Sequence, residues 1–162
     1  MPDVDRLLFI LTLITALGCG LIAGVFFAFS AFIMKALARL PTSHGIAAMQ
    51  SINVVVLNRW FLGAFFGTGV LCAVAMIAAI LRWQTPDAIF LLVGGALYLV
   101  GSVLVTIVFN VPRNQSLAFL APDSPRSADA WALYVSGWTA WNHVRTAASL
   151  AAAASFSLAL VS

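Results

Sequence analysis

The sequence contains no glutamate, and its five acidic residues are all aspartates. Charged residues make up only 8% of the 162 residues, whereas about 25% is usual for a soluble domain. Charged side chains this scarce cannot cover the surface of a water-soluble globule. The composition therefore excludes a soluble enzyme and a disordered chain, and the absence of glutamate excludes a di-iron carboxylate bundle.

Cysteine and histidine are also scarce, which limits metal and redox chemistry. Cys19 and Cys72 lie singly in apolar runs and form no CxxC pair, so we expect small buried hydrophobic side chains rather than a thiol oxidoreductase. His44 and His143 are the only histidines, and no HxxxH or ExxH motif accompanies them. A haem held by both histidines is the one alternative that this pattern leaves open, and otherwise we expect no cofactor and no metal.

Apolar residues, in contrast, are abundant: they reach 63% of the chain, with a mean hydropathy of +1.07. The run at 7–34 carries no charge and is too long for a cleaved signal peptide, so we expect a retained span. Similar runs predict further spans at about 59–82, 88–110 and 141–161. The sequence thus predicts an all-α, single-domain, four-transmembrane-helix antiparallel bundle. Its helices are expected to extend into a cytoplasmic cap formed by 35–58 and 111–140.

Proline and capping residues predict the ends of the first two helices. The first helix is expected to stop before Pro41, because a proline disfavours helical geometry in the residue that precedes it. Thr42 or Ser43 is expected to cap the second helix. We expect that helix to run through 44–58, which is mixed in polarity, and to continue into its membrane span.

Pro112 is expected to end the third helix at Asn110, which makes 111–129 the main loop. The last helix is expected to begin near Ser127 or Asp129. Because the other helices continue past the membrane boundary, one wall of the cap would then be missing. A concave site between helices is a usual place for a small ligand, and the loop would cover it.

The distribution of positive charge predicts the orientation in the cell membrane. Only Arg6 and Arg82 flank the side of the two termini. The other six cations flank the first and third connections: Lys35, Arg39, Arg59, Arg113, Arg126 and Arg145. The positive-inside rule therefore predicts that both termini face away from the cytoplasm. The cations are too dispersed to track a nucleic-acid backbone.

Glycine pairs predict close helix packing within the lipid bilayer. GxxxG motifs occur at 20–24 and 63–67, and small residues of this kind let two helix backbones approach each other. The motifs do not show whether the partner is another helix of this chain or a second copy. A homo-oligomer formed through these glycine-rich faces therefore stays open.

Amide side chains gather at the predicted cytoplasmic end, where they could bind a ligand or join helices. Gln50 and Asn53 lie one turn apart on one helix face, and Asn110 and Asn114 flank the proline at 112. Amides near helix ends more often cap a helix or hydrogen-bond a neighbouring one. We expect Gln50, Asn53 and Asn110 to form one buried network.

One face of the last predicted helix gathers aromatic and polar side chains, at 100° per residue: Trp131, Trp138, Asn142, Arg145 and Ser149. Tyr134 and Trp141 lie on the flank of this stripe. The rings could form an interfacial belt, or they could enclose a flat aromatic ligand with a cation behind them. His143 lies about 120° away from the stripe.

Four segments, at 26–34, 48–53, 109–115 and 138–146, together resemble the DUF1772, or anthrone oxygenase-like, family of small membrane proteins. The resemblance covers almost the whole chain in order. Its most specific parts are the Asn-Val-Pro that begins at Asn110 and the Trp-Asn-x-x-Arg-Thr that begins at Trp141. Some members of that family look like cofactor-independent oxygenases that convert an anthrone into an anthraquinone. The substrate does not follow from the fold alone.

The resemblance implies a set of polar site residues at matching positions: Gln50, Asn53, Asn110, Asn114, Trp138, Asn142, His143 and Arg145. In such chemistry a base removes a proton, donors hold the enolate oxygen, and the enolate reacts with dioxygen in a dry pocket. His143 could be the base, and Asn142, Asn110 or Arg145 could hold the oxyanion. The remaining candidates would bind the ring or line the substrate site: Trp138, Trp141, Tyr134, Gln50, Asn53 and Asn114.

The leading hypothesis is therefore a membrane protein that oxidises a lipophilic aromatic substrate, anthrone-like or quinol-like, at the cytoplasmic boundary. The main alternative is a non-catalytic subunit that holds a lipid, a quinone or a partner helix at the cap. A third hypothesis is a structural bundle that assembles through its glycine faces.

Overall fold

The structure is a computed structural model that describes residues 2–162, and over that range it contains helices and no strands. The first rod consists of α1 (Pro2–Ala28), a π-helical stretch (Phe29–Ile33) and α2 (Met34–Ala38). The chain returns through two separate helices, α3 (Thr42–Val55) and α4 (Arg59–Leu81).

The second half of the chain forms two further rods. One begins with α5 (Ala88–Tyr98), passes through π-helical stretches at Leu99–Leu104 and Thr106–Asn110, and ends with α6 (Val111–Ala118). The other is α7 (Ser127–Ala159), the longest helix. The predicted start of this helix near Ser127 is confirmed.

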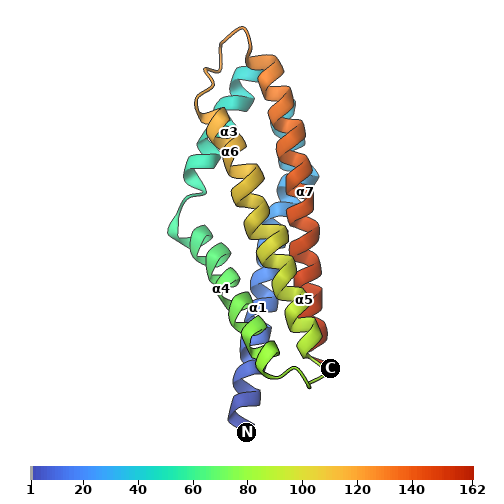
Figure 1. The fold of residues 1–162 in the computed structure, drawn as a ribbon. Coiled ribbons are helices and arrows are strands. Elements are labelled where there is room, and N and C mark those ends of the chain that lie inside the picture. Colours follow the sequence, from blue (N-terminus) through green and yellow to red (C-terminus); the bar gives the residue numbers. More distant parts are fainter. Residues whose placement is uncertain (1) are drawn as a thin grey trace.

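The rods lie side by side with alternating direction, and the two termini lie at the same end (Figure 1). α7 packs mainly against α1 and α5, and α5 packs against α4. The opposite end is built from α2, α3, α6 and the first turns of α7, and we call it the cap. This arrangement brings segments from the start, middle and end of the sequence together at the cap.

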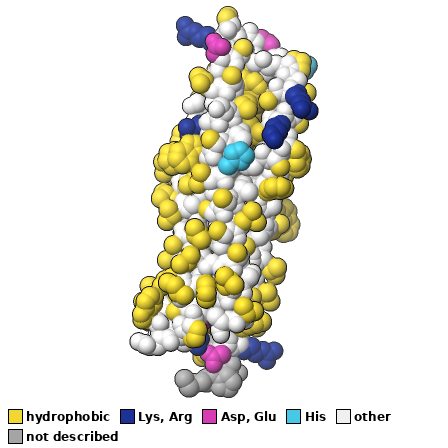
Figure 2. Space-filling view, turned by 90° about the vertical axis from the view of Figure 1, so that its right-hand side faces the viewer, with side chains coloured by type: hydrophobic (Ala, Val, Ile, Leu, Met, Phe, Trp, Pro, Cys, Tyr) yellow, Lys and Arg dark blue, Asp and Glu magenta, His cyan; other side chains and the backbone are white. Residues whose placement is uncertain are grey.

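In the part of the chain that the structure describes, three helical stretches are long and apolar enough to cross a membrane: Val4–Ala38, Arg59–Leu81 and Ala88–Ala118. Figure 2 shows hydrophobic side chains over the long middle of one face, with charged side chains gathered towards the two ends. These features indicate a multi-pass membrane protein. α7 is less apolar than the other three rods because Asn142, Arg145 and several serines interrupt it.

The prediction that Pro112 ends the third helix is wrong. Pro112 lies in the first turn of α6, directly after the π-helical stretch Thr106–Asn110. The wider π turn changes the backbone hydrogen-bond register, which lets a proline be accommodated within a continuing rod. The Arg113 Nη1 atom also donates a 2.6 Å hydrogen bond to the Phe109 carbonyl. The rod therefore reaches Ala118 and supplies the wall of the cap that was predicted to be missing.

The prediction of one continuous second helix is also wrong, because the chain breaks between α3 and α4. The Asn58 Oδ1 atom accepts hydrogen bonds from the Trp60 and Phe61 amides, both at 3.0 Å, and so caps the start of α4. Such a cap satisfies amides that have no partner within the helix. Figure 1 shows an outward bend at this break, from which α4 slants back towards α5.

The turn between α2 and α3 agrees with the prediction in part. The first rod ends at Ala38, before Pro41, as expected. Pro41 itself occupies the N-cap position of α3, and no side chain caps that helix. Thr42 is already the first helical residue, so the prediction that Thr42 or Ser43 caps this helix is wrong.

The glycines that allow close packing within the chain are not those of the GxxxG motifs. A Cβ atom at Gly20, Gly24, Gly63 or Gly67 would meet no atom within 4 Å. At Gly101, in contrast, a Cβ atom would collide with the Cβ atom of Ala148. The third rod therefore approaches α7 closely because residue 101 has no side chain.

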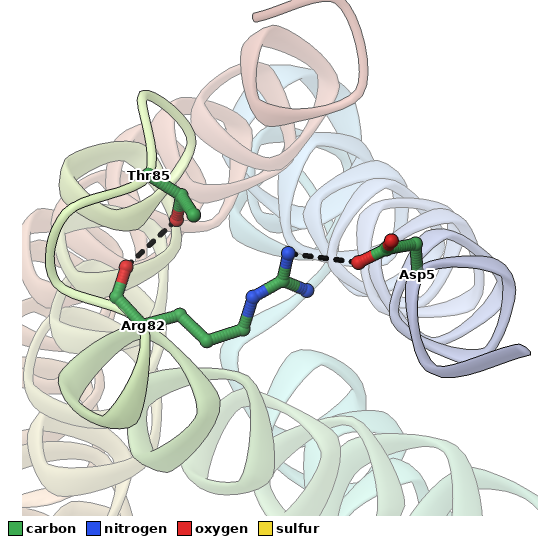
Figure 3. A network of polar contacts seen from close by, with 3 residues as sticks. All are labelled: Asp5, Arg82 and Thr85. Atoms are coloured by element: carbon green, nitrogen blue, oxygen red, sulfur yellow. Dashed lines mark hydrogen bonds and ion pairs between the residues drawn. The ribbon is translucent and has the colours of Figure 1, made fainter. Parts of the chain in front are cut away.

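A polar contact joins the helices at the end that carries the termini. The Arg82 Nη2 atom lies 2.8 Å from Asp5 Oδ1, and Thr85 Oγ1 donates to the Arg82 carbonyl at 2.8 Å (Figure 3). Among the side chains that the structure describes, those of residues 4–162, this is the only ion pair. An exposed pair of this kind contributes little to stability, about 0–1 kcal/mol.

Candidate functional site

A cavity of about 210 Å³ lies below the cap, among α1, α3, α4, α6 and α7. The outward bend between α3 and α4 leaves room for it, because α4 reaches α5 only farther along its length. An apolar cavity of about 150 Å³ is large enough to hold benzene. This cavity is therefore large enough to hold an aromatic ligand.

Aromatic side chains form much of the cavity wall: Phe26, Phe29, Phe61, Phe65 and Trp138. The Phe29 and Trp138 ring centroids lie 5.5 Å apart, and the Phe26 and Phe65 rings meet edge to face at 6.2 Å. The edge-to-face arrangement of the second pair is favourable for aromatic rings. The wall is suited to a flat apolar molecule.

Arg145 places a guanidinium group in this aromatic wall, although its side chain is only 4% exposed. Its Nη1 atom lies 3.2 Å from Thr106 Oγ1, and its Nη2 atom donates to Asn142 Oδ1 at 2.7 Å. The Cζ atom lies 4.2 Å from the Phe26 ring centroid and 5.0 Å from that of Trp138. The Nε atom is buried without a hydrogen-bond partner.

No carboxylate balances the charge of Arg145 within the described residues. The ion-pair contact of this structure is at the opposite end, and no aspartate lines the cavity. Burial of an unpaired charge is costly, so membrane proteins keep such residues where a ligand or a function uses them. Arg145 is therefore a buried, unpaired cation that lines an apolar cavity and has one unused donor.

Asn142 holds Arg145 in place from one helical turn away. Its Nδ2 atom donates to the Phe26 carbonyl and to Ser30 Oγ, both at 2.7 Å, which leaves Oδ1 for the arginine. Ser30 also lies 3.2 Å from Thr146 Oγ1. Asn142 is fully buried and does not line the cavity. Its position indicates that it orients Arg145 rather than contacting a ligand.

Two of the three π-helical stretches bring residues to the cavity. Phe29 begins the stretch at the end of α1, and Thr106 begins the stretch that precedes α6. A π-helical turn changes the direction in which the next side chains point, and such turns are frequent at functional sites. These irregular turns place Phe29 against Trp138 and Thr106 against Arg145.

The aromatic stripe of α7 is buried inside the cap. Trp131, Tyr134 and Trp138 are each at least 94% buried, and neighbouring rings along the stripe stack at 5.6 and 6.5 Å. These three residues therefore do not form an interfacial belt. Trp141 stacks on Phe109 with ring centroids 3.5 Å apart, away from the cavity wall, so it does not enclose the cavity together with Trp138.

Asn114 and Asn53 bring amide groups to the cavity from α6 and α3. The Asn114 Oδ1 atom accepts hydrogen bonds from Trp138 Nε1 at 2.8 Å and from the Tyr134 hydroxyl at 3.0 Å. Burial raises the pKa of the Tyr134 phenol above its ordinary value, so the hydroxyl stays protonated and donates. The Asn53 Nδ2 atom is buried and has no partner among the described residues.

The other predicted amides join helices and do not form the expected single network. The Gln50 Nε2 atom donates to the Leu117 and Leu120 carbonyls, which ties α3 to the end of α6. The Asn110 Nδ2 atom lies 3.2 Å from the Trp138 carbonyl. Neither side chain lines the cavity, and no hydrogen bond links either of them to Asn53.

Both histidines lie on the outer surface. His143 is exposed on the face of α7 that points away from Arg145, where it borders a shallow depression with Lys35 and Thr139. His44 is exposed near the start of α3. Among the described side chains of residues 4–162, no group of three or more His, Cys, Asp or Glu side chains could hold a metal ion. The geometry thus does not support His143 as a base for a ligand in the cavity, and that role stays a prediction.

Several site residues were not predicted from the sequence. Thr106 and Ser30 each contribute a hydroxyl group to the arginine network, and Phe61 and Phe65 contribute rings to the cavity wall. Single hydroxyls within apolar spans are a weak signal for the first two. Phenylalanines are too common in membrane helices to indicate a cavity without the tertiary structure.

Comparison with models of protein families gives a match. Residues 57–155 match the family model described as anthrone oxygenase, which agrees with the resemblance drawn from the sequence. The matched region makes up more than half of the chain and includes Asn114, Trp138, Asn142 and Arg145. No curated protein and no solved structure matches the chain.

Proposed function

The chain belongs to the anthrone oxygenase family, and on that premise we propose that its cavity binds the enolate form of a lipophilic, anthrone-like or quinol-like aromatic molecule and promotes its reaction with dioxygen. The observation that carries this proposal is Arg145. It is a buried cation without a carboxylate partner, it lies in an aromatic wall, and it has an unused donor. An enolate oxygen would supply both the missing negative charge and the missing acceptor.

The proposed reaction balances without a cofactor. Loss of the acidic C–H proton of an anthrone gives an enolate, which reduces dioxygen and forms a C–O bond. After protonation the product is a hydroperoxide. Its O–O bond breaks as the remaining C–H proton is removed: the C–H electron pair forms the new carbonyl bond, and the outer oxygen leaves as hydroxide, which takes up a proton to become water. One anthrone and one dioxygen thus give one anthraquinone and one water.

In this proposal Arg145 acts on the acidity of the bound molecule. No carboxylate or imidazole lines the cavity within the described residues, so no side chain there is an evident base. A fixed cation in an apolar site stabilises a developing oxyanion strongly, and it lowers the pKa of the group that ionises. Proton loss to water or buffer then suffices. Asn142 and Thr106 keep the guanidinium in position.

Dioxygen consumption tests whether the protein is an enzyme or only a binder. We expect purified wild-type protein in detergent to consume one dioxygen for each anthrone added and to form anthraquinone faster than detergent alone does. The measurement combines an oxygen electrode with product absorbance. Saturable anthrone binding without faster oxygen uptake would contradict catalysis and support the alternative of a non-catalytic carrier.

We also propose that α7 crosses the membrane as a fourth span, with the cap in the cytoplasm. The three apolar rods do not enclose α7 on all sides, but α7 packs along α1 and α5 for much of its length. Its least apolar residues, Asn142 and Arg145, face inwards. Arg145 is buried and therefore does not count as a charge that flanks the membrane. Five of the remaining seven cations still belong to the cap side, which the positive-inside rule assigns to the cytoplasm.

Reporter fusions test this orientation. We expect a reporter that is active only outside the cytoplasm to work when it is fused after Ser162, because an even number of spans returns the chain to the side on which it began. The matched control places the same reporter after Asp123, in the turn between α6 and α7, where it should be silent. The opposite pair of results would place the cap outside the cytoplasm.

A further inference from the structure

Two residues in the wall of the cavity that contains Arg145 have an unused amide donor. The Asn53 Nδ2 atom on α3 is buried without a partner, and Asn53 lines the cavity. Asn114 on α6 lines it as well, and its Nδ2 atom donates to no group within the described residues. Since buried polar groups in folded proteins are almost always paired, the buried Asn53 Nδ2 atom indicates a missing acceptor. The Asn114 Nδ2 atom is a second free donor on a residue that lines the same cavity.

The orientation of the Asn114 amide is set by its neighbours. An amide oxygen has two lone pairs, and Trp138 Nε1 and the Tyr134 hydroxyl occupy both of them at 2.8 and 3.0 Å. Rotation of the amide by 180° would set its NH₂ group against Trp138 Nε1–H, which can only donate. The NH₂ group therefore has to point away from α7, which makes Asn114 a donor fixed in direction.

We propose that Asn53 and Asn114 form a second recognition point, which takes a neutral acceptor oxygen of the same ligand whose anionic oxygen binds Arg145. The ligand class is then a flat aromatic molecule with two oxygen functions, one ionised and one a carbonyl or similar acceptor. Asn114 contributes only a donor to this point, because its Oδ1 atom already accepts two hydrogen bonds. This inference rests on the proposed function, since it assumes that Arg145 binds the anionic group.

Two matched probes separate the second recognition point from the first. 6-Acetyl-2-naphthoate and 6-isopropyl-2-naphthoate are both anions of nearly equal size, but only the first has a carbonyl oxygen at the far end of the ring. We expect wild-type protein in detergent to bind the acetyl probe about five-fold more tightly, the effect of one net neutral hydrogen bond. Quenching of the protein's tryptophan fluorescence measures both dissociation constants.

Two variants assign this preference to the amides. Asn53→Leu removes a donor that has no partner in the protein, so it should leave the fold and the binding of the isopropyl probe unchanged while it reduces the preference. Asn114→Asp keeps the acceptor for Trp138 and Tyr134 but removes the donor, and it should reduce the preference as well. An unaltered preference in both variants would overturn the second recognition point.

The outcomes also distinguish this inference from the proposed function. Equal binding of the two probes by the wild type would contradict the second recognition point alone. Failure of the wild type to bind either probe would contradict the proposed anion site, and with it the inference that depends on that site. A preference that is lost in the variants, while binding of the isopropyl probe is kept, supports both.

Discussion

Replacement of Arg145 by methionine is expected to remove most of the affinity for anthracene-9-carboxylate while the protein stays folded. Methionine has a similar length but supplies neither charge nor donor. A hydrogen bond to a charged group contributes about 1.5–3 kcal/mol, so the dissociation constant should rise about 10- to 150-fold. Fluorescence titration in detergent measures this change. Loss of anthrone-dependent oxygen uptake should accompany it.

The same variant should melt no lower than the wild type, which makes the effect on binding specific. Removal of an unpaired buried charge stabilises the protein, and this gain offsets the loss of the donor to Asn142 Oδ1. The matched control is Lys35→Met, which removes an exposed cation of the cap and should leave binding unchanged. Equal loss of affinity in both variants would show that the probe responds to overall charge and not to the cavity.

Replacement of Asn142 by leucine is expected to cause the largest loss of stability. The two side chains are similar in size, but leucine leaves Arg145 Nη2 without its 2.7 Å acceptor and the Phe26 carbonyl and Ser30 without their donor. Each unpaired buried polar group costs about 1–3 kcal/mol. A loss of about 3 kcal/mol or more in the free energy of unfolding is therefore expected. Thermal melting in detergent, followed by circular dichroism, detects it.

The control for this variant is its neighbour in the chain. His143→Ala changes an exposed side chain of the same helical turn that makes no hydrogen bond within the described residues, so melting should change little. The same variant tests the sequence-based role of His143 as a base: retained oxygen uptake would remove it from the mechanism, and abolished uptake would restore it. Equal melting of Asn142→Leu and the wild type would contradict the proposed support of Arg145.

The cavity illustrates how far the candidate site could be predicted. Helical periodicity is a local property, so the sequence could place Trp138, Asn142 and Arg145 on one face of α7. In the structure all three side chains are buried. The sequence could not show which of them contacts a ligand. That depends on partners such as Phe26, which lies 116 residues away from Asn142 along the chain.

The errors at the cap have a common cause. Pro112 and Asn58 both have strong local conformational preferences. Whether such a residue ends a helix or lies within one, however, depends on the backbone of the neighbouring residues. A π-helical stretch accommodates Pro112, and the Asn58 side chain caps α4 where one long helix was expected. Together these two features close the gap that was expected beside the third rod and place the cavity next to the bend between α3 and α4.

The sequence by itself determined the class of the protein, because composition and apolar run length leave no alternative to helices in a membrane. It also determined which face of α7 is polar and aromatic, since side-chain direction follows from the helical repeat. Only the tertiary structure decided that Arg145 has no anion beside it and that Asn53 and Asn114 keep unused donors. Those facts depend on which distant atoms meet, and no local pattern specifies the absence of a partner.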